Sequence, residues 1–206
     1  MNLRIGVIDL GVNNINSVIN ISKKIGYDVH VITHSNEIKN FDKIILPGIG
    51  NFDEVVKKCR KNGFESELNE HVIFKKKDVL GICLGMQLMT NTSEEGQLSG
   101  FEWINGNCKK FSLLDYSTSV HMGWNSISVK SKNSILLKDM NNKSRFYFVH
   151  SYYIEVLNEE VICNYSEYNN TKFVSSFEHN NIFGVQFHPE KSNKHGLNIF
   201  KNFYNK

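Results

Sequence analysis

Residues 78–90 read DVLGICLGMQLMT, and this stretch decides the fold. Asp78 to Ile82 is a short apolar run typical of a buried strand, and Leu84 to Thr90 has helical spacing. Cys83 stands at the junction of the two. A strand that runs directly into a helix is the repeating unit of sheets with parallel strands. The stretch therefore predicts an α/β fold with Cys83 at the end of a strand.

The segments before this stretch alternate in the same way. Apolar runs predict strands at residues 3–9, 27–33 and 43–46. Helical spacing predicts helices at residues 15–25, 53–61 and 65–74. Pro47-Gly48 is expected to stop the third strand. This order predicts an α/β fold with a mainly parallel central sheet flanked by helices on both faces.

The second half of the chain changes character. Alternating or aromatic-rich strands are expected at residues 107–111, 125–129, 145–153, 161–165 and 172–178. Asn180-Asn181 predicts a tight turn into the apolar run 182–187, and a helix is expected at 196–204. These patterns predict an antiparallel extension of the sheet. Since no linker or repeat interrupts the chain, we expect residues 1–206 to form a single domain.

Composition and charge exclude several classes of function. The chain has 24 basic and 21 acidic residues, a net charge of +3, and its longest run of cations is Lys75 to Lys77, so no nucleic acid partner is predicted. No apolar run approaches the roughly 18 residues of a membrane span. Since the first 14 residues also lack a secretory signal, we expect a cytoplasmic protein without a membrane partner.

Cysteine spacing argues against metal and disulfide chemistry. The chain has four cysteines without the close pairs of a zinc site or the density of a disulfide framework: Cys59, Cys83, Cys108 and Cys163. We therefore expect free thiols, no metal site and no cofactor. The remaining question is whether one thiol is reactive.

Gly81-Ile82-Cys83-Leu84-Gly85 has the G-x-nucleophile-x-G pattern. A sharp turn between strand and helix exposes the nucleophile, and glycines on either side avoid clashes of β-carbons. The amino end of the following helix favours a thiolate, and the Leu84 N–H can help to stabilise an oxyanion. On this pattern alone, a buried cysteine in an ordinary turn remains the alternative.

Two further segments carry residue types that suit such a nucleophile. In Phe187-His188-Pro189-Glu190-Lys191, His188 and Glu190 project to the same side of an extended chain, so the carboxylate can orient the imidazole. Cys83, His188 and Glu190 can thus form a triad. Pro47 to Phe52 contains two glycines that can turn backbone N–H groups toward a substrate oxygen, although a simple strand-ending turn is the alternative.

Six segments together point to a family. In chain order they are PGIGNF (47–52), GICLGMQL (81–88), SEEG (93–96), HMGWN (121–125), FVHSYY (148–153) and GVQFHPEKS (184–192). On these the chain resembles class I (triad) glutamine amidotransferases, and within them the HisH-type glutaminase subunits of imidazole glycerol phosphate synthase. The resemblance covers nearly the whole chain and implies a flavodoxin-like fold.

The resemblance implies a role for individual residues. Cys83 would attack the side-chain amide of L-glutamine, and His188, oriented by Glu190, would move the proton that lets ammonia leave. The remaining roles implied are an oxyanion hole at Leu84, Ile49 and Gly50, substrate binding at Gln87, Ser151 and Tyr152, and a partner interface or gate at Asn13, Trp124, Tyr147 and Lys191. For Trp124 the alternative is a packed core residue, and for Lys191 a solvated charge.

The resemblance also implies a partner. From the HisH-type subunits that the chain resembles, ammonia passes to a HisF-type cyclase subunit, a (β/α)₈ barrel. The heterodimer of the two makes imidazole glycerol phosphate and AICAR in histidine biosynthesis. One alternative is a HisH-like paralogue that supplies ammonia to a sugar-aminating synthase in surface-polysaccharide biosynthesis. The others are a cysteine peptidase or γ-glutamyl hydrolase, and an inactive interaction subunit. Two positions depart from the family pattern, since Asn13 replaces a glycine and Val120 stands where proline is common.

Overall fold

A computed structural model describes residues 3–11, 15–112 and 119–206. Asn13, which the resemblance assigns to the partner interface or gate, lies outside these residues. All other residues with a predicted role in the site are described.

The central part of the sheet is parallel, as predicted. Its strands lie side by side in the order β2-β1-β3-β4-β13. Each neighbouring pair runs in parallel. The bounds are β1 Ile5–Ile8, β2 Val29–Ile32, β3 Lys43–Gly48, β4 Asp78–Cys83 and β13 Ile182–Val185. This order brings β4, which ends in Cys83, next to β13, which leads to His188.

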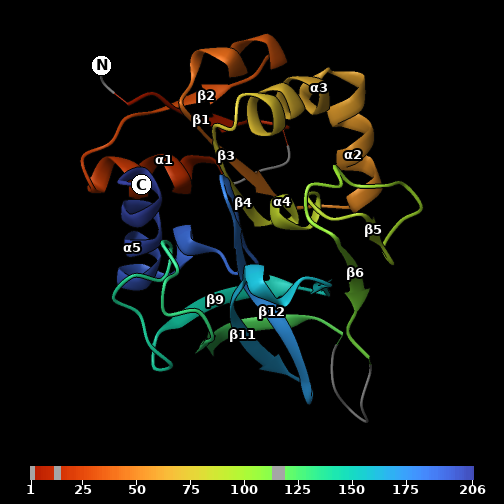
Figure 1. The fold of residues 1–206 in the computed structure, drawn as a ribbon, viewed down its shortest axis with the longest axis vertical. Coiled ribbons are helices and arrows are strands. Elements are labelled where there is room, and N and C mark those ends of the chain that lie inside the picture. The colour runs from red at the N-terminus through yellow and green to blue at the C-terminus, as the bar shows by residue number, and fades with distance from the viewer. Residues whose placement is uncertain (1–2, 12–14, 113–118) are drawn as a thin grey trace.

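The sheet continues into the predicted antiparallel extension, which forms the lower part of Figure 1. Beyond β13 the order is β12-β10-β6-β5, with β11 paired to β12 off this path and β8 paired to β11. The bounds are β5 Thr92–Ser93, β6 Gly106–Lys110, β8 Ser128–Val129, β10 Tyr152–Val156, β11 Ile162–Tyr168 and β12 Thr171–His179. A separate antiparallel ribbon pairs β7 (His121–Ser126) with β9 (Arg145–His150).

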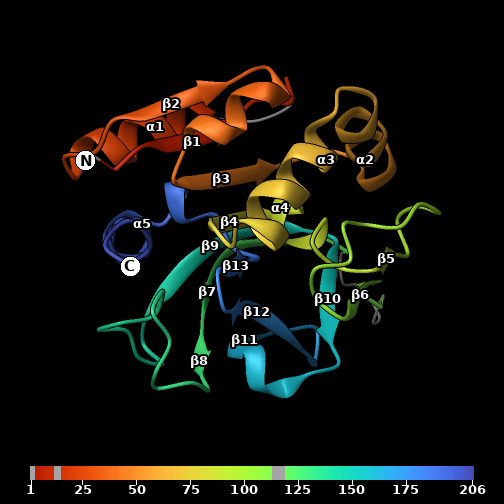
Figure 2. The same ribbon diagram turned by 45° about the horizontal axis from the view of Figure 1, so that its top comes forward.

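Helices cover both faces of the parallel strands (Figure 2). The helices are α1 Ile15–Lys24, η1 Ser35–Asn40, α2 Phe52–Lys61, α3 Phe64–Asn69, η2 Glu70–Phe74, α4 Leu84–Gln87, η3 Glu159–Val161, η4 Pro189–Lys191 and α5 Asn193–Tyr204. Successive residues of β3 enter different cores, because side chains alternate across a strand: Leu46 packs with α2 and α3, whereas Ile45 packs with α1 and α5. Burial on both faces explains the uninterrupted apolar runs of these strands.

Several predicted boundaries are wrong. Strand β3 continues through Pro47-Gly48, because its pairing with β1 ends at Ile45 and proline is tolerated where only one side of a strand is paired. The helix predicted at 84–90 is a single turn, α4. The strand predicted at 145–153 divides at Ser151, because β9 pairs with β7 in the ribbon whereas β10 pairs with β6 in the main sheet.

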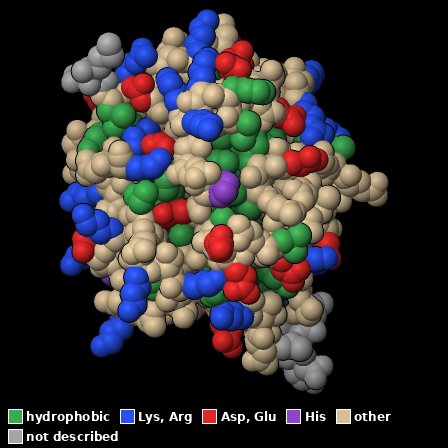
Figure 3. Space-filling model, in the orientation of Figure 1, with side chains coloured by type: hydrophobic (Ala, Val, Ile, Leu, Met, Phe, Trp, Pro, Cys, Tyr) green, Lys and Arg blue, Asp and Glu red, His purple; other side chains and the backbone are tan. Residues whose placement is uncertain are grey.

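The surface gives no sign of a strongly charged patch on the face shown in Figure 3, where acidic and basic side chains of the described residues are interspersed. In the described ranges, no helix is long and apolar enough to cross a membrane. Nor do the residues that the structure describes include a group of three or more His, Cys, Asp or Glu side chains that could hold a metal ion.

Candidate active site

The turn after β4 holds Cys83 in an unusual backbone conformation, with φ 55° and ψ −112°. A β-carbon on Gly81 would lie 2.7 Å from the Gly85 carbonyl oxygen, and one on Gly85 would lie 1.8 Å from the Leu46 carbonyl oxygen. Both contacts are too close for any other residue type. The two glycines therefore permit the turn, as the sequence predicted, at a backbone strain on the order of 1–3 kcal/mol at Cys83.

His188 and Glu190 meet at the end of the neighbouring strand. The His188 Nδ1 atom lies 2.7 Å from Glu190 Oε1, and both side chains are buried. The backbone of His188 is held as well, since its N–H donates to the Tyr147 carbonyl and its carbonyl accepts from the Ser192 hydroxyl. The imidazole is thus fixed in orientation from two sides.

The surroundings of His188 favour its protonated form. Burial by itself lowers the pKa of this imidazole, but the negative charge of a Cys83 thiolate and the hydrogen bond to Glu190 outweigh burial and raise the pKa to about 10. The Nε2 atom is buried, and Cys83 is the neighbour that interacts with the imidazole on the side away from Glu190. An imidazole held beside a thiol is the arrangement that activates a cysteine nucleophile.

A cavity of about 300 Å³ opens over Cys83. Its lining residues are Ile49, Gly50, Cys83, Leu84, Gln87, Glu95, Val149, His150, Ser151 and Tyr152. The structure thus brings together the nucleophile and all the residues predicted for the oxyanion hole and for substrate binding. Gly50 has a φ of +105°, a conformation that glycine adopts far more readily than other residues, so this loop uses the freedom that its two glycines provide.

The family can now be stated, since a model of the class-I glutamine amidotransferases matches residues 6–206. The chain belongs to this family. It is therefore a glutamine amidotransferase, the class of enzyme that the six segments of sequence predicted.

Curated relatives are similar to this amidotransferase along nearly its full length. The imidazole glycerol phosphate synthase subunit HisH 2 of Methanococcus maripaludis is 43% identical, over 97% of this chain and 98% of the relative. The protein of the same name from Pseudomonas aeruginosa is 43% identical, over 96% of each chain. The subunit HisH of Leptospira borgpetersenii is 38% identical, over 97% of this chain and 98% of the relative.

Solved structures share the fold at much lower identity. PurLQS from Thermotoga maritima has a TM-score of 0.78 at 16% identity, covering 100% of this chain and 99% of that chain. The glutaminase domain of Trypanosoma brucei CTPS has a TM-score of 0.68 at 17% identity, covering 100% of this chain and 95% of that domain. These likenesses concern the fold alone, and they agree with the predicted α/β architecture.

Two residues of the amidotransferase site escaped the sequence interpretation. The Gln186 side-chain amide lies 3.6 Å from Cys83 Sγ and accepts a 3.0 Å hydrogen bond from Gln87. Glu95 lines the cavity, where burial raises the pKa of its carboxyl group while a 2.8 Å hydrogen bond from the Phe52 N–H opposes that rise. Both lie in segments that carried the resemblance, SEEG and GVQFHPEKS, so the signal was present but was not assigned to these positions.

The predicted substrate-binding backbone is partly occupied by internal hydrogen bonds. The Ser151 carbonyl accepts from the Phe111 N–H at 3.1 Å, and the Tyr152 carbonyl accepts from Gln87 Nε2 at 2.9 Å. The Ser151 carbonyl thus keeps a second lone pair for a substrate, whereas the Tyr152 carbonyl has a second internal partner, His150 Nδ1 at 2.8 Å. Gln87 lines the cavity, but its amide nitrogen is committed to Tyr152 and Gln186.

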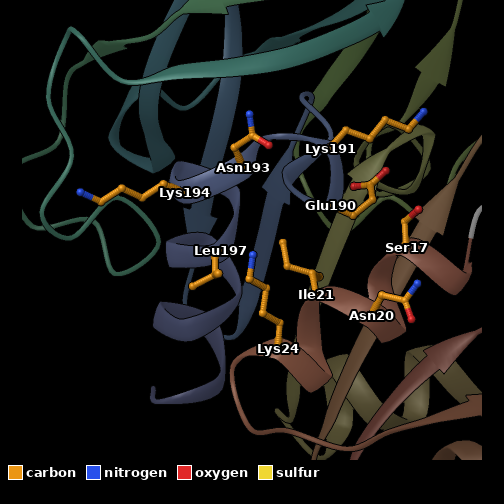
Figure 4. A pocket seen from close by; sticks show the side chains of 9 residues that line it. All are labelled: Ser17, Asn20, Ile21, Lys24, Glu190, Lys191, Asn193, Lys194 and Leu197. Carbon is orange, nitrogen blue, oxygen red and sulfur yellow. The ribbon is translucent and has the colours of Figure 1, made fainter.

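The three described residues predicted for the partner interface lie together outside the cavity. Trp124 and Tyr147 face each other across β7 and β9, with ring centroids 6.2 Å apart, and the Lys191 ammonium lies 5.8 Å from the Tyr147 ring centroid. Trp124 is 42% exposed, so it is not a packed core residue. Lys191 also borders a pocket of about 510 Å³ that α1, η4 and α5 enclose beside Glu190 (Figure 4).

Proposed function

We propose that this amidotransferase is the glutaminase subunit of an imidazole glycerol phosphate synthase, and that its residues 1–206 form a single domain. It hydrolyses L-glutamine to glutamate and ammonia, and passes the ammonia to a HisF-type cyclase subunit in the cytoplasm. One observation carries the proposal: His188 lies beside both Cys83, which lines the cavity, and Glu190, in a protein 43% identical to HisH 2 subunits over nearly its whole length.

In the proposed reaction, the Cys83 thiolate attacks the side-chain amide carbon of glutamine. The carbonyl oxygen becomes negatively charged, and backbone N–H groups of Leu84 and of the Ile49-Gly50 loop stabilise it. Protonated His188 gives its proton to the amide nitrogen, and ammonia leaves. Water then attacks the glutamyl thioester, with His188 as the base that accepts its proton. The hydrogen bond from His188 Nδ1 to Glu190 supports this role, because it directs Nε2 toward the reacting groups.

The lining of the cavity suits the polar ends of glutamine. Glu95 offers a carboxylate that can pair with the α-ammonium group of the substrate, and Gln87 borders the same space. A small amino acid fits a volume of about 300 Å³. We include Glu95 among the substrate-binding residues, together with Gln87, Ser151 and Tyr152.

The partner is proposed to dock on the outer face of the β7–β9 ribbon, beside Lys191. Exposed apolar side chains that alternate along one strand support this location, since Met122 is 65% exposed and Trp124 is 42% exposed. Such side chains, with a cation at the rim, are typical of protein–protein interfaces. Because ammonium in water is no nucleophile, docking close to Cys83 also provides a sheltered path for ammonia.

The test is glutamate release from glutamine by the purified chain, alone and with the same organism's HisF-type cyclase plus its nucleotide substrate. A large increase that needs both partner and nucleotide is the expected result. The matched control is Cys83→Ala in the same complex, which should release no glutamate.

A second candidate keeps the chemistry and changes the recipient of ammonia. Both relatives at 43% identity carry the number 2 in their names, as one of two copies of the subunit would. The second candidate is a copy that supplies ammonia to another synthase, such as a sugar-aminating one. If the cyclase does not stimulate glutamate release, although the chain is folded and Cys83 can be alkylated, this candidate is supported over the first.

A further inference from the structure

A chain of hydrogen bonds crosses the interior from β7 to the wall of the cavity. Asn125 Nδ2 lies 3.2 Å from His121 Nε2, and His121 Nδ1 lies 3.0 Å from His150 Nε2. His150 Nδ1 in turn lies 2.8 Å from the Tyr152 carbonyl oxygen. Both imidazoles are buried, and the proposed mechanism uses neither of them.

The direction of the protons in this chain follows from both of its ends. The Tyr152 carbonyl oxygen can only accept, so His150 Nδ1 carries a proton. At the other end, Asn125 Oδ1 accepts from the Ser126 N–H at 2.7 Å, which identifies Nδ2 as the donor toward His121. Burial lowers the pKa of His121 to about 4 and that of His150 to about 3, so each ring holds one proton at pH 7. Both ends therefore require the Nδ1–H form of both rings.

The chain of hydrogen bonds ends on a carbonyl that anchors the cavity. The Tyr152 carbonyl oxygen accepts from both His150 Nδ1 and Gln87 Nε2. Gln87 Nε2 also donates to Gln186 Oε1 at 3.0 Å, and Gln186 Nε2 lies 3.6 Å from Cys83 Sγ. A shift of this one carbonyl would therefore move two lining residues, Tyr152 and Gln87, relative to the nucleophile.

The His121 ring is held by packing on both faces. His121 is stacked between Phe148 and Tyr168, with centroid distances of 4.7 and 4.6 Å. Leucine at this position would keep much of the apolar packing and remove only the hydrogen bonds. Packing and hydrogen bonding can thus be separated experimentally.

We propose that His121 and His150 are positioning residues of the glutamine site, which hold the Tyr152 carbonyl, and with it the Val149–Tyr152 wall, where glutamine binds. The inference rests on the proposed function, because it concerns the same cavity. Their effect is expected on substrate binding more than on the nucleophile, since no hydrogen bond among the described residues joins either imidazole to Cys83, and the wall touches Cys83 Sγ only by a long contact of 3.8 Å with the Val149 carbonyl.

The experiment measures covalent capture of Cys83 by 6-diazo-5-oxo-L-norleucine, an electrophilic analogue of glutamine, in the free chain. The dependence of the rate on concentration separates binding (the half-saturating concentration) from reaction (the limiting rate). Iodoacetamide, which needs only the thiolate, is the second probe. Burial raises the pKa of Cys59, Cys108 and Cys163 to about 12, so alkylation reports on Cys83, and Cys83→Ala gives the background.

His121→Leu is expected to raise the half-saturating concentration of the analogue at least fivefold, with the iodoacetamide rate within twofold of wild type. His121→Asn should recover most of this loss, because its side-chain amide nitrogen can occupy the place of Nδ1 and donate to His150. The matched control is His71→Leu, which removes another buried histidine that lies outside the network. Equal effects of His121→Leu and His71→Leu, or an equal fall for both probes, would overturn the proposal.

A second variant and a spectroscopic measurement keep the proposal testable if His121→Leu does not fold. Asn125→Asp replaces the donor by an acceptor at a half-buried position, and it should reverse both rings and raise the half-saturating concentration. In the wild type, nitrogen-15 NMR should find the Nδ1–H form for both His121 and His150, and an Nε2–H form on either would contradict the network. If iodoacetamide labels wild-type Cys83 but the analogue never does, even after the cyclase and its nucleotide are added, the proposed function itself fails, and the role of the pair fails with it.

Discussion

Two regions of the molecule bury histidines, and the pKa values of these histidines are shifted in opposite directions. In the turn region, residues 81–85 and 187–191, Cys83 and Glu190 raise the pKa of His188 to about 10 although burial lowers it. In the ribbon region, residues 121–126 and 145–152, burial lowers the pKa of His150 to about 3. Burial is common to both rings, so the charge of the neighbouring groups decides which imidazole is protonated.

This difference separates two tasks around one cavity. A protonated imidazole beside a thiolate can donate a proton to a leaving group. A neutral imidazole with one N–H and one acceptor nitrogen can instead link two neighbours in a fixed direction. The turn region therefore suits chemistry, and the ribbon region suits positioning.

Cys83→Ala should have the largest effect on the chemistry of the turn region. Glutamine-dependent activity is expected to fall by about 10⁴-fold or more, because the variant has no nucleophile. The pKa of His188 should also fall, since the main charge that raises it is gone. Glutamate release and an NMR titration of His188 measure the two effects. The complex with the cyclase should still use added ammonia, and continued use of glutamine would show that the nucleophile is another residue.

Glu190→Gln should have the next largest effect. The amide can offer an N–H to His188 Nδ1 in place of an acceptor, so the imidazole loses both its orientation and a charge that raises its pKa. We expect glutamate release to fall by about 10²- to 10⁴-fold. Glu160→Gln, at an exposed position of η3, is the control. Similar rates for the two variants would remove Glu190 from the triad.

Gly85→Ala tests the backbone of the turn region through stability. The added β-carbon would lie 1.8 Å from the Leu46 carbonyl oxygen, so β3 and α4 would have to separate. The free energy of unfolding should fall by about 3 kcal/mol or more, measured by urea denaturation. Gly26→Ala is the control: its φ is +87° and nothing lies within 4 Å of the new carbon, so only backbone strain of about 1–2 kcal/mol is expected. A smaller loss for Gly85→Ala than for Gly26→Ala would contradict the packing argument.

Mild acid should lower the stability of the protein through its buried neutral histidines, two of which lie in the ribbon region, rather than through His188 in the turn region. Burial lowers the pKa of His71, His121 and His150 to about 4 or below. Above about pH 6.5 these rings are neutral in the folded and unfolded chain, so stability is unaffected. As the pH falls below that value, the unfolded chain binds protons that the folded chain does not, and stability decreases. At pH 5 each ring should lower the free energy of unfolding by on the order of 1–2 kcal/mol.

Urea denaturation at pH 7 and pH 5 measures this loss. His121→Asn, which has no titrating ring at that position, should lose less stability between the two pH values than the wild type. An unchanged stability of the wild type from pH 7 to pH 5 would mean that these rings are not held neutral.

The parallel half of the fold could be predicted because its signals are local. The apolar runs of β1 and β4 and the glycines beside Cys83 act within a few residues, and the structure agrees with them. The division of residues 145–153 into β9 and β10 could not be predicted, because which sheet each part joins depends on partners elsewhere in the chain. Glu95 and Gln186 were missed for the same reason. Glu95 belongs to the site because it lines the cavity, and Gln186 because it contacts Cys83, and neither contact can be read from the local sequence.

By itself, the sequence determined the family and its α/β fold, because the spacing of apolar residues and the G-x-Cys-x-G turn are local requirements of the backbone. It also named most of the residues that line the cavity with Cys83, although not Glu95, Val149 or His150. Only the tertiary structure decided the protonation of the histidines. Their pKa values depend on groups far away in the chain, as when His121 meets His150 and Cys83 meets His188, and electrostatic energy depends on distance in space rather than on separation in sequence.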